Sequence, residues 1–321
     1  MIVKHFKQCS LEVIGTDHVQ TGLPCQDKTA YASYDGARVI VLSDGAGSKK
    51  NSDLGADIAT KTIAELLSKN FDEYYLLLEN APLKGSKLAK KLTHQVYQNL
   101  NKAASEQENL SIMEMSCTVL FVATKEDKYI QGHIGDGLIG ELVTNEKGLE
   151  VRIRSYPENN GAPNITFFIT DSDAVDHFRI TSGTMPSNVK GFVLMSDGPE
   201  EVLYDPQKKT INQYIQNLFG MYKVNSFDLY KKTLERFLRE QISQYSYDDL
   251  SMNFMYIEQE SMGYYKDKGK DYVEHLKSKV NNGARVLQTS AYSFVIDDSF
   301  KEYDLNKEDK RKIMKLFNEY R

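Results

Sequence analysis

Two apolar segments of the chain end in the same tripeptide, Ser-Asp-Gly. Residues 37–45 read ARVIVLSDG, and residues 191–198 read GFVLMSDG. An unbroken apolar run of this kind, ending at turn residues, predicts a short strand that is covered on both faces. A carboxylate at the end of such a strand is costly to remove from water unless positive charge lies opposite it. The fold must therefore bring Asp44 and Asp197 to a place where their charge is balanced.

Strand patterns outnumber helix patterns along the chain. Amphipathic helices are predicted from residue 52 onward, over 88–100, over 211–219 and over 227–242. Because neighbouring strands are joined by tight turns, we expect an α+β fold of antiparallel sheets covered by helices. The predicted strands lie at residues 11–14, 28–34, 38–42, 118–123, 129–134, 138–143, 151–155, 165–169, 192–195 and 250–257.

The composition changes near residue 259. Residues 262–285 are highly charged with few apolar anchors, residues 283–298 contain β-branched and aromatic side chains, and the last sixteen residues read as a polar helix. We therefore expect a domain over residues 1–259 and a C-terminal extension over residues 260–321.

The charge balance and the cysteines exclude several classes of protein. Lysine and arginine total 40 against 45 aspartates and glutamates, so the chain lacks the basic character of a nucleic-acid binder. No run of eighteen apolar residues predicts a membrane span, and the N-terminus has no apolar core of signal-peptide length. Three cysteines, Cys9, Cys25 and Cys117, cannot all pair and show no metal-binding spacing, which favours reduced thiols in a cytoplasm.

Five aspartates stand at predicted strand ends. Asp44 and Asp197 follow apolar runs, Asp136 lies in a Gly-Asp-Gly turn, Asp248 precedes the last strand and Asp27 opens the second. Each Asp-Gly taken alone is a common turn dipeptide. Taken together, acids at adjacent strand tips would repel one another unless cations lie among them, and an oxygen-only cluster suits Mg²⁺ or Mn²⁺. Two such ions lower the pKa of a water enough for attack on phosphorus.

The aspartates lie within an ordered series of motifs: CQDKTAY, VIVLSDGAGSKKNSDLGADIAT, SCTVLFVA, GHIGDGLIGEL, GFVLMSDGPEEVL and YDDLSMNF. This series resembles the metal-dependent protein phosphatases of type 2C, the PPM family. The resemblance spans residues 8–258, and GTDHVQTGLPCQD and DGAGS are most similar to the bacterial branch. It implies an αββα sandwich of two antiparallel sheets flanked by helix pairs.

The resemblance also implies roles for individual residues. Asp44 matches the aspartate that bridges two metal ions, and Gly45 the residue whose carbonyl binds the second ion. Asp197 and Asp248 match the acids that hold the first ion. Asp136, with Asp197, matches a pair that holds a weaker third ion in bacterial members, and Asp27 matches a carboxylate that orders metal-bound water.

The implied activity is hydrolysis of phosphoserine and phosphothreonine in proteins, with two Mn²⁺ or Mg²⁺ ions. The expected partners are a phosphorylated protein substrate and a cognate Ser/Thr kinase, and a monomer is expected. Two alternatives stay open: a catalytically weak module that binds phosphoproteins in a regulatory role, and a metal-dependent nuclease, against which the low basic content argues.

Three positions depart from the family pattern. Gln26 stands where many members have glutamate, Ala46 stands where animal members place a histidine, and residues 19–26 contain no arginine to grip the phosphate. His18 is a candidate for proton transfer, because histidine titrates near neutrality. The alternative is a loop histidine bonded to a backbone carbonyl. The segment DSDAVDHF, residues 171–178, falls where related phosphatases carry a variable flap, and it is either such a flap or an acidic surface loop.

Overall fold

The computed structural model describes residues 2–79, 85–108, 110–146, 148–158, 166–220, 227–261, 286–289 and 292–295. Residues 8–256 form one compact unit, and residues 1–7 with 257–321 form a second. The predicted terminal helix and the charged segment 262–285 lie outside the described residues.

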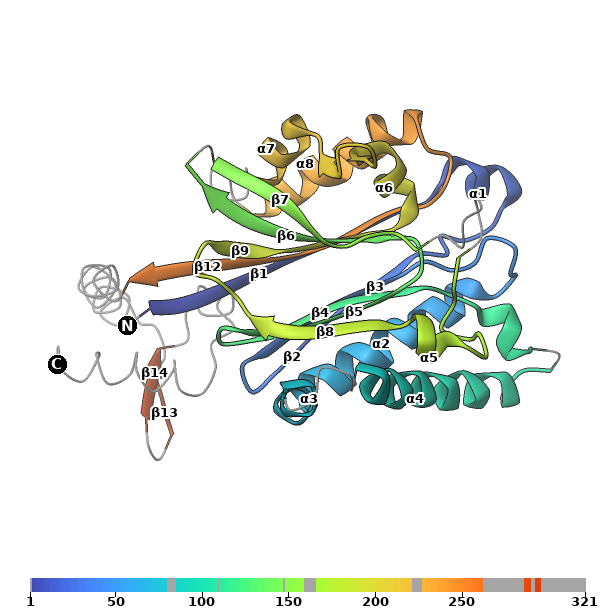
Figure 1. Cartoon of the computed structure of the whole chain (residues 1–321), viewed down its shortest axis with the longest axis horizontal. Helices are drawn as coiled ribbons and strands as arrows, with labels where there is room; N and C mark the ends of the chain where they lie inside the picture. Colours follow the sequence, from blue (N-terminus) through green and yellow to red (C-terminus); the bar gives the residue numbers. More distant parts are fainter. Residues whose placement is uncertain are drawn as a thin grey trace. The chain divides into compact units, whose positions relative to one another are not determined.

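Two five-stranded sheets form the centre of the protein (Figure 1). Every strand pair with a defined register in these sheets is antiparallel. In one sheet the spatial order is β2 (Lys28–Tyr34), β3 (Ala37–Ser43), β4 (Val119–Lys125), β5 (Lys128–Ile134) and β8 (Arg179–Thr184). In the other the order is β1 (Ile2–Val13), β12 (Leu250–Ser261), β9 (Val189–Met195), β6 (Leu138–Asn145) and β7 (Gly148–Ser155).

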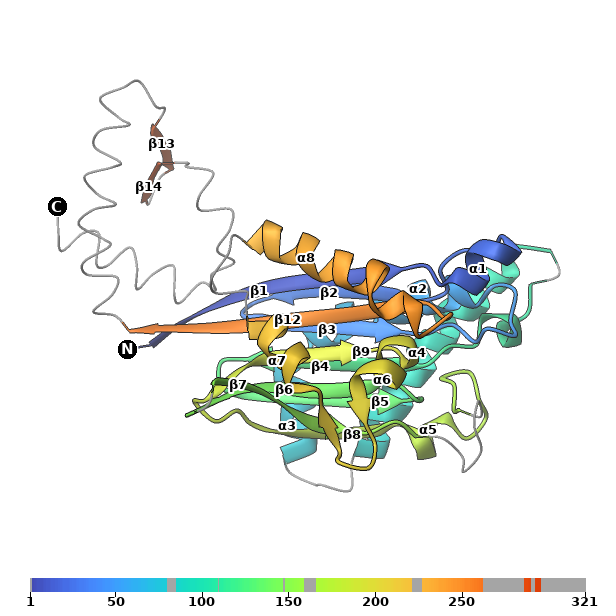
Figure 2. The ribbon, with the colours of Figure 1, turned by 90° about the horizontal axis from the view of Figure 1, so that it is seen from above.

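Helices cover the outer face of each sheet. Figure 1 shows one helical layer under the β2–β8 sheet and another over the second sheet, and Figure 2 shows the second layer from above. The predicted αββα sandwich is confirmed. The first layer contains α2 (Ser52–Lys69), α3 (Phe71–Glu79) and α4 (Gly85–Ser105), and the second contains α6 (Asp197–Leu203), α7 (Gln213–Gly220) and α8 (Phe227–Glu240).

The sandwich explains why strand β3 is apolar without interruption. Its seven residues are all buried. Val39 and Val41 belong to the core that the β2–β8 sheet forms with α2 and α4, whereas Ile40 and Leu42 point to the opposite face, toward the second sheet. A strand between a helical layer and another sheet has no face for polar side chains, so the run ends in polar residues only where it leaves the sandwich.

One predicted strand is wrong. Residues 166–169 are irregular, and β8, which follows them, was not predicted. Ile169 is apolar because it packs in the core with α2 and α4, with Phe167 against the same core. Burial rather than strand pairing therefore accounts for this apolar run.

Short elements complete the described chain. In the second unit, residues 286–289 pair antiparallel with residues 292–295, where the sequence predicted strand content. The short elements are α1 (Thr16–Thr21), the 3₁₀ helices Ile112–Met115 and Ile242–Gln244, α5 (Ala174–His177), β10 (Tyr204–Asp205), β11 (Thr210–Ile211), β13 (Val286–Thr289) and β14 (Tyr292–Val295).

Asn253 forms a direct polar link between the two sheets. It lies on β12, is fully buried, and its Nδ2 donates to the carbonyl oxygens of Ala30 (3.1 Å) and Val41 (3.0 Å) in the other sheet. Its Oδ1 accepts from Gln8 Nε2 at 3.0 Å and from Ser10 Oγ at 3.3 Å. Because this amide is satisfied on both sides, its burial is tolerated.

We predict that Asn253→Ala lowers the free energy of unfolding by about 1–3 kcal/mol, since it leaves buried polar groups without partners. Urea unfolding in the presence of EDTA measures the change. Asn101→Ala is the control: Asn101 is exposed on α4, and its replacement should change stability by less than about 0.5 kcal/mol. Equal effects of the two substitutions would contradict the prediction.

Candidate metal centre

Asp44 is held where β3 leaves the sheet. Its backbone N–H donates to Thr118 Oγ1 (3.0 Å), and its carbonyl accepts from the Thr118 N–H (2.8 Å). The next residue, Gly45, forms an isolated antiparallel β-bridge with Cys117. A Cβ on Gly45 would lie 2.8 Å from Ser52 Oγ and 2.9 Å from the Gln26 carbonyl oxygen, so only glycine fits without a shift of its neighbours.

Asp136 lies in the turn that passes from β5 in one sheet to β6 in the other. The turn begins at Gly135, whose φ of +119° favours glycine. The residue therefore belongs to the connection between the sheets.

Asp197 and Asp248 come from neighbouring strands of the second sheet. Asp197 is the first residue of α6, directly after β9, and its Oδ1 accepts from the Gly198 N–H at 2.7 Å. Asp248 precedes β12, and its Oδ1 accepts from the Asp249 N–H at 2.7 Å. Since β9 and β12 are paired, both residues stand at one end of the same strand pair.

These residues converge although they are far apart in the sequence. One carboxylate oxygen each from Asp44, Asp136 and Asp197 lie within 4.8 Å of one another. Asp27 is 1% exposed, and its charge acts on Asp44, while Asp197 and Asp248 act on Asp27. The five predicted aspartates thus occupy one small region between the ends of the two sheets.

Burial and mutual repulsion both disfavour the charged forms of this cluster. Burial raises the pKa of Asp27 and of Asp44 well above the ordinary value, and neighbouring carboxylates raise both further. Burial and then the charges of Asp248 and Asp136 raise the pKa of Asp197 to about 7. Burial also raises the pKa of Asp136 and Asp248. Opposite charge placed among these groups would reverse the effect.

Three buried oxygens in this region have no hydrogen-bond partner among the described residues. They are Asp27 Oδ2, Asp136 Oδ1 and Gln26 Oε1. Buried acceptors of this kind are normally satisfied. Carboxylate and carbonyl oxygens without competing nitrogen or sulfur ligands form the donor set that Mg²⁺ and Mn²⁺ prefer. The residues present therefore fit divalent cations.

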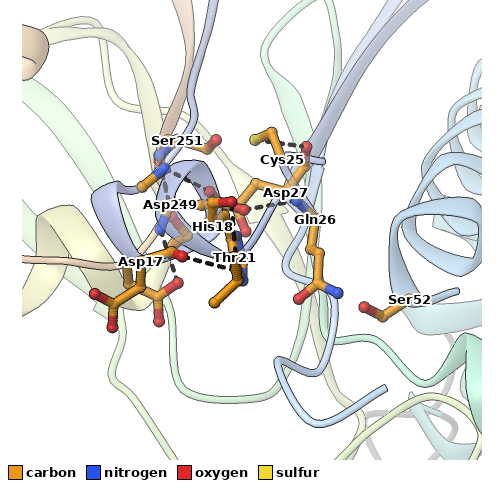
Figure 3. Close-up of polar contacts among 12 residues, drawn as sticks. Asp17, His18, Thr21, Cys25, Gln26, Asp27, Ser52, Asp249 and Ser251 are labelled. Atoms are coloured by element: carbon orange, nitrogen blue, oxygen red, sulfur yellow. Dashed lines mark hydrogen bonds and ion pairs between the residues drawn. The ribbon is translucent and has the colours of Figure 1, made fainter. Parts of the chain in front are cut away.

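Asp249, a residue not predicted from the sequence, accepts hydrogen bonds from the loop that leads to Asp27 (Figure 3). Asp249 Oδ1 accepts from the Gly15 N–H at 2.7 Å, and Oδ2 accepts from the Gln26 N–H at 2.6 Å. His18, the candidate for proton transfer, has its Nδ1 3.0 Å from Asp249 Oδ1. The only signal in the sequence was the pair of adjacent acids at 248 and 249.

Glu200 is a second residue that sequence analysis missed. It lies on α6, and burial followed by the charge of Asp197 raises its pKa to about 8. The segment containing it, SDGPEE, was interpreted only through Asp197. A carboxyl group of this kind adds to the negative potential of the cluster once it ionises.

Residues 171–178 contain α5 and are tied to the Asp136 turn through Glu158. The Glu158 N–H donates to the Gly135 carbonyl at 3.1 Å. Its carboxylate lies 3.3 Å from His177 Nδ1 and 3.1 Å from Arg179 Nε. The His177 ring stacks on Phe167, with 3.4 Å between ring centroids. The segment that matched a flap thus connects, through these side chains, to the edge of the aspartate cluster.

Comparison with known proteins identifies relatives. A family model described as protein phosphatase 2C matches residues 14–239. Serine/threonine-protein phosphatase 3 of Escherichia coli (strain K12) is 29% identical over 176 residues, which cover 53% of this chain and 65% of that protein. The aligned region therefore spans less than two thirds of the length of this relative.

Solved structures share the fold at low sequence identity. The S. agalactiae serine/threonine phosphatase has a TM-score of 0.54 at 14% identity, covering 79% of this chain and 100% of that chain. The catalytic domain of the serine threonine protein phosphatase PstP, solved in complex with two manganese ions, has a TM-score of 0.52 at 14% identity, covering 80% of this chain and 99% of that one.

Among the described residues no helix is long and apolar enough to cross a membrane.

The raised pKa values predict how pH affects the metal-free protein. A carboxyl group whose pKa is higher in the folded state than in the unfolded state binds more protons when folded, so stability is lost as pH rises between the two values. For Asp197 and Glu200 this window extends from the ordinary pKa near 4 up to about 7 and about 8. In EDTA, we expect the Tm to fall by at least about 3 °C between pH 5.5 and 8, or ~1 kcal/mol.

Asp44→Asn removes one of the repelling charges and should reduce this fall. The matched control is Asp205→Asn, because Asp205 is bonded to Lys208 and its pKa is lowered, so it does not titrate in this window. Thermal unfolding followed by circular dichroism gives the comparison. A fall that is the same in wild type and Asp44→Asn would show that the cluster does not cause it.

Proposed function

Because the chain belongs to the protein phosphatase 2C family, we propose that it is a metal-dependent protein phosphatase that hydrolyses phosphoserine and phosphothreonine. One observation carries the proposal: oxygens of Asp44, Asp136 and Asp197 lie within 4.8 Å of one another. Ionised carboxylates at this spacing in a half-buried site are strongly disfavoured unless cations lie among them. Mn²⁺ or Mg²⁺ suits the oxygen-only donor set.

The ligand roles that we propose are those that the resemblance implies. Asp44 and the carbonyl of Gly45 would hold ions at the end of β3. Asp197 and Asp248 would hold an ion from the paired strands β9 and β12. Asp136 with Asp197 would hold a further, weaker ion. When bound, the ions lower the pKa of water and neutralise phosphoryl oxygens.

The remaining polar atoms orient water and substrate. Asp27 Oδ2 and Gln26 Oε1 are buried acceptors, and each can accept a hydrogen bond from a water in the site. Gln26 Nε2 donates to the Lys49 carbonyl at 2.9 Å. This bond fixes the orientation of the amide and leaves Oε1 available to accept a hydrogen bond. Gln26 thus supplies one acceptor where many relatives have a carboxylate.

The cysteines do not offer a competing thiol mechanism. Burial raises the pKa of Cys25 strongly, and the charge of Asp27 raises it further. Burial also raises the pKa of Cys117 to about 12. A thiol acts as a nucleophile through its thiolate, which these surroundings disfavour. We therefore propose that water, rather than a cysteine thiolate, attacks the phosphoryl group.

The binding module without catalysis is not favoured. A phosphoprotein-binding site needs donors for the phosphate oxygens, whereas this cluster presents acceptors that require cations. The nuclease alternative finds no support in the family match. Bound divalent ions would neutralise the acidic cluster and so allow an anionic substrate to bind there.

We predict that Asp44→Ala abolishes Mn²⁺-dependent hydrolysis of p-nitrophenyl phosphate and of a phosphothreonine peptide. We expect kcat/KM to fall at least about 10³-fold, since the ions supply several kcal/mol of stabilisation and each 1.36 kcal/mol is tenfold in rate. Asp57→Ala is the control, because Asp57 pairs with Lys61 on the surface of α2. Activity retained in Asp44→Ala, or lost equally in Asp57→Ala, would overturn the proposal.

His18 remains our candidate for protonation of the leaving group. Its Nδ1 faces Asp249, which leaves Nε2 for proton transfer, and one of its nitrogens lies within 4.8 Å of an Asp248 carboxylate oxygen. An aspartate on one imidazole nitrogen orients the other, as in other acid–base pairs.

His18→Asn should therefore lower kcat about 10²-fold or more on a phosphoserine peptide, whose alkoxide needs a proton. On p-nitrophenyl phosphate, whose leaving group is stable without one, kcat should change by less than about threefold. Steady-state kinetics on both substrates provides the measurement. A similar loss on both would assign His18 a structural role.

Other features remain predictions of the sequence. We propose that residues 1–259 form the phosphatase domain and that residues 260–321 recruit a partner or regulate it. The substrate is then a protein phosphorylated by a Ser/Thr kinase of the same pathway. A monomer and a cytoplasmic location are proposed on the same basis.

A further inference from the structure

Asp249 connects the two ends of a loop that the metal centre depends on. The loop runs from Gly15, after β1, to Gln26, just before Asp27 and β2. Both ends donate a backbone N–H to one carboxylate, Gly15 to Oδ1 and Gln26 to Oδ2. The Asp249 side chain is 2% exposed, so these are charge-assisted bonds in a dry environment, which are the strongest type.

The loop lies directly on the backbone that carries Asp248. A Cβ on Gly15 would lie 2.4 Å from the carbonyl carbon of Asp248 and 2.5 Å from the Tyr247 carbonyl oxygen. The Asp17 N–H donates to that same Tyr247 oxygen at 3.2 Å. Because the contact is this close, the loop cannot shift relative to the residues that precede β12.

Two proposed metal-centre residues are attached to this junction. Asp27 follows Gln26 along the loop, and Asp248 immediately precedes Asp249. Asp27 contributes an unpartnered buried oxygen, and its pKa is raised first by burial and then by the charges of Asp249, Asp197 and Asp248. One carboxylate thus joins the segments from which two of the five aspartates come.

We propose that Asp249 is a positioning residue for the metal centre: by binding Gly15 and Gln26 at once, it sets the distance of Asp27 from Asp248 and so the affinity for divalent ions. The inference rests on the proposed function. We place Asp249 outside the ion shell, since each of its oxygens already accepts a backbone N–H and Oδ1 also faces His18 Nδ1 at 3.0 Å. Substitution of residues that orient metal ligands through hydrogen bonds typically changes metal affinity or activity 10–100-fold.

Asp249→Asn is a sharp test because it preserves shape. An amide has one acceptor oxygen, so one of the two backbone N–H groups would face an NH₂ group instead. We expect Mn²⁺ binding to the metal-stripped full chain, measured by isothermal titration calorimetry, to weaken about 10–100-fold. At limiting Mn²⁺, kcat should fall, while KM for p-nitrophenyl phosphate changes less than about threefold.

The matched control is Asp17→Asn. Asp17 lies in the same loop and carries the same charge, but its side chain is exposed. Its Mn²⁺ affinity should stay within about threefold of wild type. If both variants lose affinity equally, the effect is general electrostatics. If Asp249→Asn lowers the Tm but leaves Mn²⁺ affinity unchanged, Asp249 only stabilises the fold. Either result overturns the proposal.

A second measurement uses wild type and so does not depend on the variant folding. Coupling between sites is reciprocal: if the Asp249 junction strengthens ion binding, bound ions strengthen the junction by the same factor. Hydrogen exchange of peptides that contain Gly15 and Gln26 should slow about tenfold or more at saturating Mn²⁺. Unchanged exchange in a protein that binds Mn²⁺ overturns the positioning role alone, whereas a wild type that binds no Mn²⁺ overturns the proposed function as well.

Discussion

Repulsion among buried carboxylates is the constraint that organises this protein. Asp27 is buried and Asp44 is half-buried, and each lies in the field of other aspartates. Packing alone cannot offset the cost of such a group, because removal from water and like charge both act against ionisation. The backbone donors at Asp197 and Asp248 relieve part of the cost. The remaining cost can be offset by positive charge placed among the carboxylates. This requirement connects the fold to its proposed chemistry.

The sandwich distributes these charges over two sheets. Asp27 and Asp44 come from the sheet that packs on α2 and α4, and Asp197 and Asp248 come from the other sheet. Asp136 lies in the turn that crosses between them. No single hairpin or helix contains the cluster, so it exists only when both sheets are stacked. Ion binding and folding of the sandwich are therefore thermodynamically linked.

Local patterns in the sequence carried much of this structure. The unbroken apolar run before Asp44 is explained by cover on both faces of β3, and the amphipathic segments became α2, α4, α7 and α8. The five aspartates were recognised because each stands at a strand end beside turn residues. These features depend on neighbours along the chain, which a pattern can register.

Other features depend on partners that no local pattern registers. Asp249 binds Gly15, 234 positions away, so nothing in its neighbourhood distinguishes it from Asp248. The apolar residues near Ile169 were predicted as a strand because apolar content alone does not separate a paired strand from an irregular segment packed on helices. Glu200 was overlooked because its raised pKa comes from burial and from Asp197, which only the folded chain brings about.

The Asn253 amide has a mechanical consequence. Stacked sheets are held mainly by apolar contact, which has no preferred direction and resists sliding weakly. Hydrogen bonds from β12 to the carbonyls of Ala30 and Val41 are directional, so they oppose sliding of one sheet over the other. Asp27 and Asp44 border those same strands, so these bonds also hold the two aspartates in register with Asp197 and Asp248 of the other sheet. A polar contact in the interior thus fixes the spacing of charged groups at the sheet ends.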